Sequence, residues 1–341
     1  EFRRSDGPGF HNAVTAYQKG ATGQGVTIGV IDTGIDPNSH EFAGRIVSAS
    51  RDVAGNRGLG DDDGHGSAVT RVAAAAKDNR DIMGIAFNAS ILALRADTPG
   101  SCTATSGNAD EAGCLFTDSA IANGINVARQ TGARVINLSL GGEGRIGGSL
   151  ANAIRLASEA GIVLIVSAGN EFGKDQPDYD PNNPSPFAQS ILAAGGSNVI
   201  IATSVDDSSQ ISSFSNRAGV SQASVLSALG SGICCAYEDD SIKTTVRNGQ
   251  TFITVFNGTS FAAPQISGAA ALLAQAFPNL TGAQIVDILL RSARDAGVSG
   301  TDDVYGRGIL DIAAAFQPQG TTSLAGTSTV VALGSSAGTT S

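Results

Sequence analysis

Short apolar runs alternate with helical stretches along the first half of this chain. Four runs rich in β-branched residues are predicted to be buried strands: 26–31, 91–94, 134–138 and 162–166. Helices are predicted between them, over 67–76, 118–130 and 149–160. Strands separated by helices of this length predict an α/β fold, with a mainly parallel sheet flanked by helices on both faces. A ligand is then expected to bind at the carboxyl ends of the strands.

The C-terminal third is richer in predicted strands. They cover 191–195, 199–203, 224–229, 243–246 and 251–256. The last two flank Asn248-Gly249, a dipeptide typical of two-residue turns in which both residues have positive φ. A β-hairpin insertion in the α/β domain is therefore predicted. Helices are predicted near 260–277, 281–292 and 308–316.

Composition excludes several classes of partner. The 341 residues include 21 Lys and Arg against 31 Asp and Glu, a formal net charge of −10. Because phosphate binding needs clustered basic residues, no nucleic-acid partner is expected. No apolar run reaches the ~18 residues that a membrane span requires, so none is expected in this chain. We also expect a monomer.

The end of the chain has a composition of its own. Residues 318–341 are mainly Ser, Thr, Gly and Ala and carry no charge. We expect one folded domain over 1–317, followed by a linker or tail over 318–341. An irregular arm lying on the domain surface is an equally good interpretation of the tail.

The four cysteines are Cys102, Cys114, Cys234 and Cys235. None shows the two-residue spacing of a zinc knuckle, so a cysteine metal site is not expected. Their even number favours disulfide bonds and hence export. A Cys102–Cys114 pair with a Cys234–Cys235 pair is favoured, while cross-pairing or reduced thiols stay open.

Four polar residues lie at the ends of predicted strands or the starts of predicted helices, where catalytic side chains are often found. Asp32 ends a predicted buried strand and needs a partner there. His65 lies between two glycines at a helix start, where an accessible imidazole can act as a general base. Ser260 follows Gly-Thr at the N-terminus of a long helix, whose free N–H groups favour developing negative charge. Asn170 follows a strand and could donate to an oxyanion. Taken singly, each also fits a turn or a helix cap.

The remaining histidines and the acidic run near His65 suggest less. His11 and His40 lie in polar stretches and are expected to be surface residues. The run 61–63 is more typical of a solvated turn than of an ion site, although its oxygen density leaves calcium open.

The order Asp, His, Asn, Ser resembles that of the subtilisin-like serine proteases, the subtilase family. The local strings match at Val30–Asp36 (VIDTGID), 64–66 (GHG), 137–142 (NLSLGG), 167–170 (SAGN) and 258–264 (GTSFAAP). The resemblance extends from about residue 15 to residue 316.

This resemblance implies a role for each of the four residues. Ser260 would be the nucleophile, His65 the base that takes its proton, and Asp32 the group that orients the imidazole. Asn170 and the backbone N–H of Ser260 would form the oxyanion hole.

The resemblance also implies how a peptide would bind. The strand edge that pairs with residues before the scissile bond would be Ser139, Leu140 and Gly141. The wall of the primary specificity pocket would be Ser167, Ala168 and Gly169. The small residues in this wall favour an apolar side chain before the cut. The chain is thus expected to be a secreted serine endopeptidase of broad specificity, acting on proteins or peptides through an acyl-enzyme.

Departures from the family pattern leave that expectation in place. The family usually has Thr-His-Val-Ala-Gly where this chain has Ser67-Ala68-Val69-Thr70-Arg71, and His where it has Gln265. None of these positions belongs to the triad. No cofactor is expected for catalysis. Structural calcium stays open, although the loop over 77–81 is shorter than the family's calcium-binding loop. An inactive subtilase-fold adhesin or binding module is the alternative function.

The C-terminal region carries a narrower resemblance. The segments 292–297 and 303–311, followed by the tail, resemble subtilase passengers of bacterial autotransporters. That implies a protein exported to the cell surface or the exterior of a bacterium. An ordinary secreted subtilase with a trimmed tail is the alternative.

Overall fold

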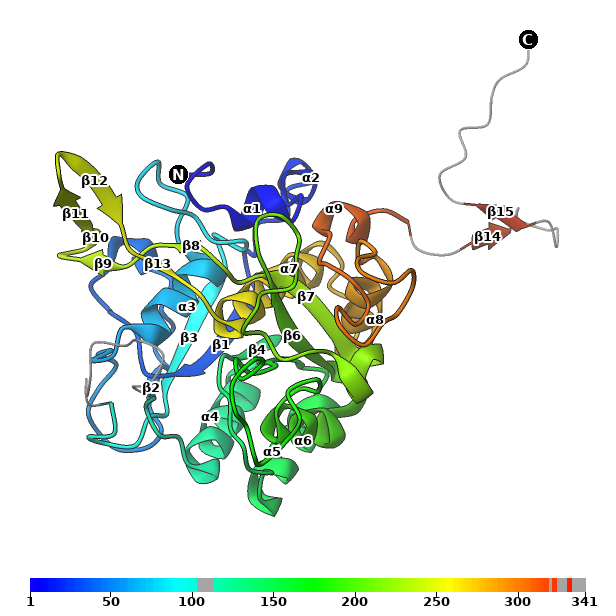
Figure 1. The fold of residues 1–341 in the computed structure, drawn as a ribbon, viewed down its shortest axis with the longest axis horizontal. Coiled ribbons are helices and arrows are strands. Elements are labelled where there is room, and N and C mark those ends of the chain that lie inside the picture. The colour runs from blue at the N-terminus through cyan, green and yellow to red at the C-terminus, as the bar shows by residue number, and fades with distance from the viewer. Residues whose placement is uncertain (103–112, 319–320, 324–329, 333–341) are drawn as a thin grey trace, which may run out of the picture.

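The computed structural model describes residues 1–102, 113–318, 321–323 and 330–332, so most of the predicted tail lies outside the described residues. A seven-stranded sheet with the strand order β2-β3-β1-β4-β5-β6-β7 forms its centre (Figure 1). All neighbouring strands pair in parallel. The strands are β1 (Thr27–Asp32), β2 (Arg51–Asp52), β3 (Ser90–Arg95), β4 (Val135–Leu138), β5 (Val163–Ser167), β6 (Val199–Val205) and β7 (Val225–Leu229). The predicted α/β fold is confirmed.

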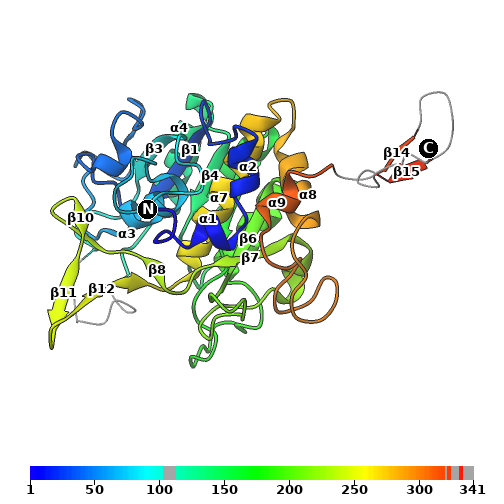
Figure 2. The ribbon, with the colours of Figure 1, turned by 90° about the horizontal axis from the view of Figure 1, so that it is seen from above.

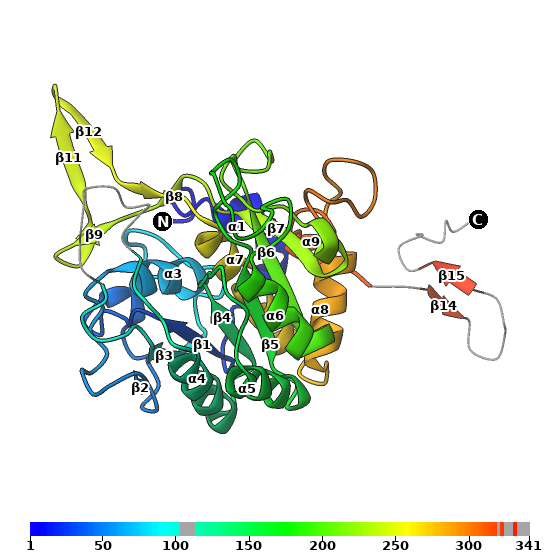
Figure 3. The same ribbon diagram turned by 60° about the horizontal axis from the view of Figure 1, so that its bottom comes forward.

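The sheet is buried on both faces, which explains why its strands are almost continuously apolar. In β5, Val163 and Ile165 pack into one hydrophobic cluster, while Leu164 and Val166 pack into another on the opposite face. The helices that cover the second cluster are α4 (Asp118–Thr131), α5 (Gly148–Glu159) and α6 (Pro186–Gly195). The helices that cover the first are α3 (His65–Ala74), α7 (Thr259–Ala276) and α8 (Gly282–Arg291) (Figure 3).

Local sequence explains where several helices begin. Thr281 and Gln284 form a capping box at α8, in which each side chain accepts a hydrogen bond from the other residue's backbone N–H. Ser185 caps α6 by accepting from the Ala188 N–H at 3.3 Å. Short helices complete the domain at its termini: α1 (Gly7–Phe10), α2 (Val14–Gln18) and α9 (Ile312–Ala315). None of the helices in the described part of the chain combines the length and apolarity needed to cross a membrane.

Residues 233–256 form an arm that projects from the domain (Figures 2 and 3). Its paired strands are β8 (Ile233–Cys234) with β13 (Val255–Phe256), β9 (Tyr237–Glu238) with β10 (Ser241–Ile242), and β11 (Thr244–Arg247) with β12 (Gln250–Ile253). The turn between β11 and β12 has φ values of 53° at Asn248 and 75° at Gly249. The predicted hairpin insertion is confirmed.

Two predicted elements are wrong. Residues 191–195 were predicted as a strand but belong to α6, because a short apolar run fits a buried helix face as well as a strand. Of the helix predicted over 308–316, only α9 forms, since Ile309 makes isolated β-bridges with Ser227 and Arg294.

The cysteines lie in the arrangement favoured from the sequence. The sulfur atoms of Cys102 and Cys114 are 2.09 Å apart. Cys234 and Cys235 are adjacent residues at the start of the arm, and both are buried. Disulfide formation by the protein stays a prediction.

Candidate active site

The predicted site residues meet at the carboxyl edge of the sheet. Asp32 ends β1, Ser139 directly follows β4, and Asn170 lies just beyond β5. In the sheet, β3 and β2 lie on one side of β1, and β4 to β7 follow one another on the other side. The strand order therefore reverses at β1. Such a switch point is where open α/β sheets bind ligands.

Asp32 and His65 are in direct contact. Asp32 is 1% exposed, and its Oδ1 lies 2.7 Å from His65 Nδ1. The same oxygen accepts a hydrogen bond from the Thr33 N–H at 2.8 Å. With Nδ1 donating to the carboxylate, Nε2 of His65 is left free to accept a proton.

Close backbone packing holds His65 over the end of β1. A Cβ atom at Gly66 would lie 2.3 Å from the carbonyl oxygen of Gly34, so only glycine fits there. The Gly66 N–H donates to Thr33 Oγ1 at 2.9 Å. The start of α3 is therefore fixed against the residues that follow Asp32.

Within the acidic run over 61–63, Asp62 and Asp63 are exposed, as expected of a solvated turn, but Asp61 is half-buried and bonded. Asp61 accepts hydrogen bonds from Thr33 Oγ1 at 2.7 Å, from the Gly64 N–H at 2.9 Å and from the Ser67 N–H at 2.7 Å. It therefore caps α3 and joins that helix to the loop after β1. These contacts join residues from separate elements, so the sequence gives no sign of them.

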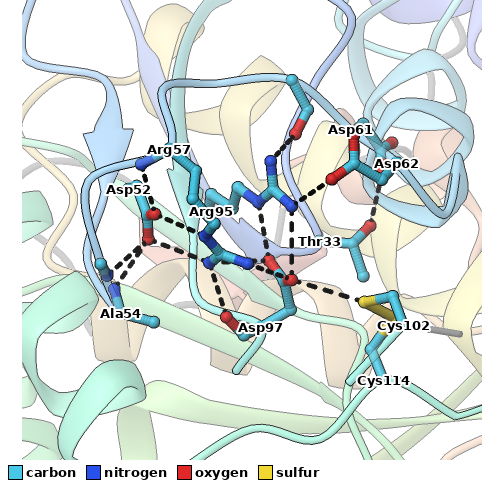
Figure 4. A network of polar contacts seen from close by, with 12 residues as sticks. Thr33, Asp52, Ala54, Arg57, Asp61, Asp62, Arg95, Asp97, Cys102 and Cys114 are labelled. Atoms are coloured by element: carbon cyan, nitrogen blue, oxygen red, sulfur yellow. Dashed lines mark hydrogen bonds and ion pairs between the residues drawn. A yellow bond between two sulfur atoms is a disulfide. The ribbon is translucent and has the colours of Figure 1, made fainter. Parts of the chain in front are cut away.

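Two arginines form a network of ion pairs next to this loop, and one of them, Arg95, reaches it (Figure 4). Arg95, the parallel partner of Asp32 in β3, donates to Asp97 at 2.9 Å and to Asp62 at 2.7 Å. Arg57 donates to Asp97 at 2.6 Å and to Asp52 at 2.8 Å. Burial alone would raise the pKa of Asp52, but hydrogen bonds from Arg57 hold it at about 2. The sequence reasoning did not identify this network.

Asn170 is linked to Thr259, the residue that precedes Ser260. Asn170 Oδ1 accepts hydrogen bonds from the Thr259 N–H at 2.9 Å and the Thr259 hydroxyl at 3.0 Å. The amide nitrogen Nδ2 of Asn170 lies close to Gly258, which directly precedes α7: a Cβ atom added to Gly258 would be 3.8 Å from it. Ser260 is the second residue of α7, so its N–H is one that a helix leaves unpaired. Its hydroxyl donates to Ser139 O at 3.4 Å.

The acidic surroundings of His65 change its affinity for protons. Burial alone would lower the pKa of His65, but the Asp32 carboxylate, with smaller contributions from Asp63 and Asp61, raises it to about 9. The pKa of Asp63 is also raised, mainly by burial. His65 keeps 28% of its side chain exposed, on the side of the cleft.

The cleft has a volume of about 1740 Å³ and is lined by His65, Ser260 and Asn170. Its lining is strongly acidic among the described residues. The carboxylates are those of Asp36, Asp61, Asp63, Glu143, Glu171, Asp206, Glu238, Asp239 and Asp240, against the bases Arg71 and Lys174.

The predicted substrate-binding residues occupy two different places. Ser139, Leu140 and Gly141 line the cleft. Ser167 and Ala168 are buried behind it, and the Ser167 hydroxyl donates to Leu140 O at 2.7 Å. Gly169 adopts φ 111° next to Asn216 and Glu171. Residues 139–141 therefore line the cleft directly. Residues 167–169 are not part of the lining and instead pack behind residues 139–141.

The prediction of surface positions for His11 and His40 is wrong. His11 is fully buried, with Nδ1 2.9 Å from Leu310 O and Nε2 accepting from the Leu229 N–H. Burial lowers its pKa to about 4. His40 is only 11% exposed. Their polar sequence neighbours gave no indication of these tertiary contacts.

Comparison with known proteins identifies the family. The sequence model of the Subtilase family matches residues 23–308. Subtilisin DY of Bacillus licheniformis is 30% identical over 300 residues, spanning 88% of this chain and 93% of that protein. The extracellular serine protease of Serratia marcescens is 27% identical over 383 residues, spanning 92% of this chain and 33% of its own length. The MycP3 protease of the type VII (ESX-3) secretion system superposes with a TM-score of 0.68 at 27% identity, covering 91% of this chain and 87% of that one. The chain is therefore a member of the subtilase family, a subtilisin-like serine endopeptidase.

Proposed function

We propose that Asp32, His65 and Ser260 are the catalytic triad of this endopeptidase, and that Asn170 and the Ser260 N–H form its oxyanion hole. The observation that carries the proposal is the 2.7 Å contact between Asp32 Oδ1 and His65 Nδ1, in a cleft that Ser260 also lines. A buried carboxylate bonded to Nδ1 fixes the tautomer in which Nε2 is a base.

In the first half of the reaction, Ser260 Oγ turns from Ser139 O and attacks the carbonyl carbon of the scissile bond. His65 Nε2 takes the hydroxyl proton, and Asp32 stabilises the imidazolium that forms. The carbonyl oxygen becomes an oxyanion, which accepts hydrogen bonds from Asn170 Nδ2 and the Ser260 N–H. Because Thr259 holds Asn170 Oδ1, the amide can present Nδ2 without reorganising.

In the second half, His65 passes the proton to the leaving amine, the peptide bond breaks, and an acyl-enzyme remains on Ser260. A water molecule then attacks the ester carbon as His65 takes one of its protons. Return of that proton to Ser260 Oγ releases the carboxylic acid product and restores the enzyme.

A covalent probe tests the assignment. A fluorophosphonate forms a phosphonyl ester with an activated serine, and we expect one mass addition, on the peptide that contains Ser260. Ser260→Ala and His65→Ala should abolish labelling, while Ser149→Ala, at an exposed position on α5, should leave it unchanged. Labelling of a different serine would refute the assignment.

Substrate binding follows from the cleft lining. Residues Ser139, Leu140 and Gly141 would pair as a strand edge with the substrate residues before the cut. Ser167, Ala168 and Gly169, which lie behind that edge, would back the wall of the specificity pocket and favour an apolar side chain there. This is supported by the place of 139–141 in the cleft lining and by the small size of residues 167–169. Digestion of a peptide library tests it, and strict cleavage after arginine would contradict it.

We extend the proposal to organisation and location. Residues 1–317 would form the catalytic domain of a monomer, and 318–341 a linker or tail. The even cysteine count and the extracellular location named for the Serratia marcescens relative support export. Export as an autotransporter passenger is the narrower form of this proposal. Mass spectrometry of peptides without reduction tests the disulfides, and free thiols in the secreted protein would contradict them.

Structural calcium fits the candidate cluster of the described residues poorly. Among the described residues, His40, Glu41 and Asp81 could share an ion. Calcium takes six to eight oxygen ligands, whereas this group includes an imidazole. The carbonyl oxygens of Ala74 and Glu41 nearby already accept hydrogen bonds from Arg45. We therefore assign no calcium to this cluster.

A further inference from the structure

Exposed apolar side chains are concentrated on the arm over 233–256. In the described part of the chain, nine large hydrophobic side chains are exposed, and four of them belong to the arm: Val246, Phe252, Ile253 and Val255. Val246 keeps 68% of its surface exposed. Apolar side chains gathered on a projecting element are typical of a surface that binds another molecule. The proposed triad uses none of them.

The far end of the arm is an exposed two-stranded ribbon. Among the described strands, β11 and β12 pair only with each other, and all four residues of each are exposed. Because paired residues share a face and successive residues alternate, Val246 and Ile253 lie on one face and Phe252 on the other. At each outer edge, every second residue has a backbone N–H and C=O without a partner in the ribbon. A lone hairpin is only marginally stable in water, so an added strand would stabilise it.

The base of the arm, in contrast, is held against the domain. The guanidinium of Arg71, on α3, lies 3.8 Å from the centre of the Tyr237 ring. The Tyr237 hydroxyl donates to Glu41 Oε1 at 2.5 Å. The His40 N–H donates to Asp240 Oδ1 at 3.0 Å. The ribbon therefore stands on a fixed base, and Figures 2 and 3 show it extending beyond the rest of the domain.

The base of the arm also forms part of the cleft. Residues 237–240 and both residues of β13 line it. The Phe256 ring stacks on the Phe261 ring with their centres 5.1 Å apart, and Phe261 meets the His65 ring edge-on at 5.8 Å. The arm therefore joins the cleft next to the proposed general base.

The chemistry of the cut says which part of a substrate would reach the arm. His65 gives its proton to the leaving amine, so the residues after the cut leave the site past His65. The residues before the cut would pair with 139–141, which lie in another part of the cleft lining. The substrate chain after the cut therefore runs toward the arm, and the ribbon continues the surface along which it passes.

We propose that the ribbon of β11 and β12 is a second binding surface for protein substrates, which holds an extended apolar segment after the scissile bond. The inference rests on the proposed triad, because it takes His65 as the donor to the leaving amine. The segment adds to an outer edge of the ribbon as a third strand, while Val246, Phe252 and Ile253 contact its apolar side chains. The surface increases affinity for long unfolded polypeptides and adds nothing for short peptides.

Kinetics on a long and a short substrate test the proposal. Casein supplies an extended polypeptide on both sides of each cut, whereas a peptide nitroanilide has no residue after the cut. In the arm variant Val246→Thr/Phe252→Thr/Ile253→Thr, threonine keeps the preference for strands but removes apolar surface. We expect KM for casein to rise about 10-fold with kcat unchanged. Both parameters for the nitroanilide should match the parent, which also reports an intact fold.

The matched control removes exposed apolar surface elsewhere. Val220 and Val298 are 78% and 74% exposed and lie outside the arm. Val220→Thr/Val298→Thr should leave KM for casein and for the nitroanilide at the parental values.

Hydrogen exchange locates the contact. The inactive Ser260→Ala chain is mixed with a synthetic casein peptide that the parent cleaves, carrying about twelve residues after the cut, which extend about 40 Å. We expect slower exchange of the amides over 244–253 with this peptide. A version that ends one residue after the cut should leave those amides unprotected.

Three results would overturn the proposal. Equal KM for casein in the parent and the arm variant would show that the ribbon binds no substrate. Equal losses on casein and on the nitroanilide would mean that the arm supports the catalytic site instead. Self-association of the parent that the arm variant abolishes, measured by sedimentation, would assign the ribbon to a second copy of the chain. Inactivity of the parent on both substrates is a different failure, which would refute the proposed triad itself.

Discussion

Asn170 Oδ1 accepts two hydrogen bonds from Thr259, one from the backbone N–H and one from the hydroxyl. The amide is thereby fixed by the residue that immediately precedes the proposed nucleophile. We expect Asn170→Leu to lower kcat by about 10²–10³ with little change in KM, because the lost donor acts on the transition state. Thr259→Val, which keeps the N–H bond but loses the hydroxyl, should lower kcat less.

Steady-state kinetics on a chromogenic peptide separate these effects. A rise in KM at constant kcat in Asn170→Leu would mean that the amide binds the substrate in its ground state. That result would contradict its role in the oxyanion hole.

The pKa of His65 predicts an alkaline enzyme. His65 must be neutral to accept the serine proton, and its pKa is raised to about 9. We expect kcat/KM to increase with pH up to about 9. Asp63→Asn removes a carboxylate that raises this pKa and should move the acidic limb to lower pH. Asp175→Asn, at an exposed position outside the cleft lining, is the control and should leave the limb in place.

The same pKa has a consequence for folding. Because the folded pKa of His65 lies above the value of about 6.5 in an unfolded chain, its protonation stabilises the fold. That contribution is complete below about pH 6.5 and is lost as the pH rises through about 9. Denaturant unfolding of the parent and of His65→Gln across this range measures it, and parallel pH dependences would contradict the assignment.

The Arg95 network should stabilise the loop over 60–63. Arg95→Met leaves Asp97 and Asp62 without one donor each and should lower the free energy of unfolding by about 1.5–3 kcal/mol. Arg155→Met breaks an exposed ion pair on α5 and should cost only about 0.3–0.5 kcal/mol. Urea unfolding compares the two, and equal losses would mean that the buried network adds no stability.

The acidic cleft predicts a charge preference. Nine carboxylates against two bases line it, so peptides with added lysines should have a higher kcat/KM than neutral peptides of the same length. Salt should reduce that advantage, because about 1 M salt shortens the screening length to about 3 Å. The neutral peptide is the control. An advantage independent of salt would exclude long-range attraction as its cause.

Features that depend on a few consecutive residues could be predicted from the sequence. Asp32, His65 and Ser260 each lie in a short string with a characteristic glycine environment, and Asn248-Gly249 specifies its own turn. The Arg95 and Arg57 contacts could not be predicted in this way, since they join residues as far as 40 positions apart. His11 and His40 show the same limit, because burial of a histidine depends on elements brought to it by the fold. The apolar run over 191–195 fits a strand as well as a helix. The structure shows that it is the end of α6, a helix that begins after its N-cap residue Ser185.

The role of Ser260 is tested most directly by comparing kcat on casein and on a chromogenic peptide for the parent, Ser260→Ala and Ser149→Ala. If Ser260 is the nucleophile, Ser260→Ala loses about five to six orders of magnitude in kcat, while Ser149→Ala matches the parent. Near-parental activity in a correctly folded Ser260→Ala protein would contradict the account.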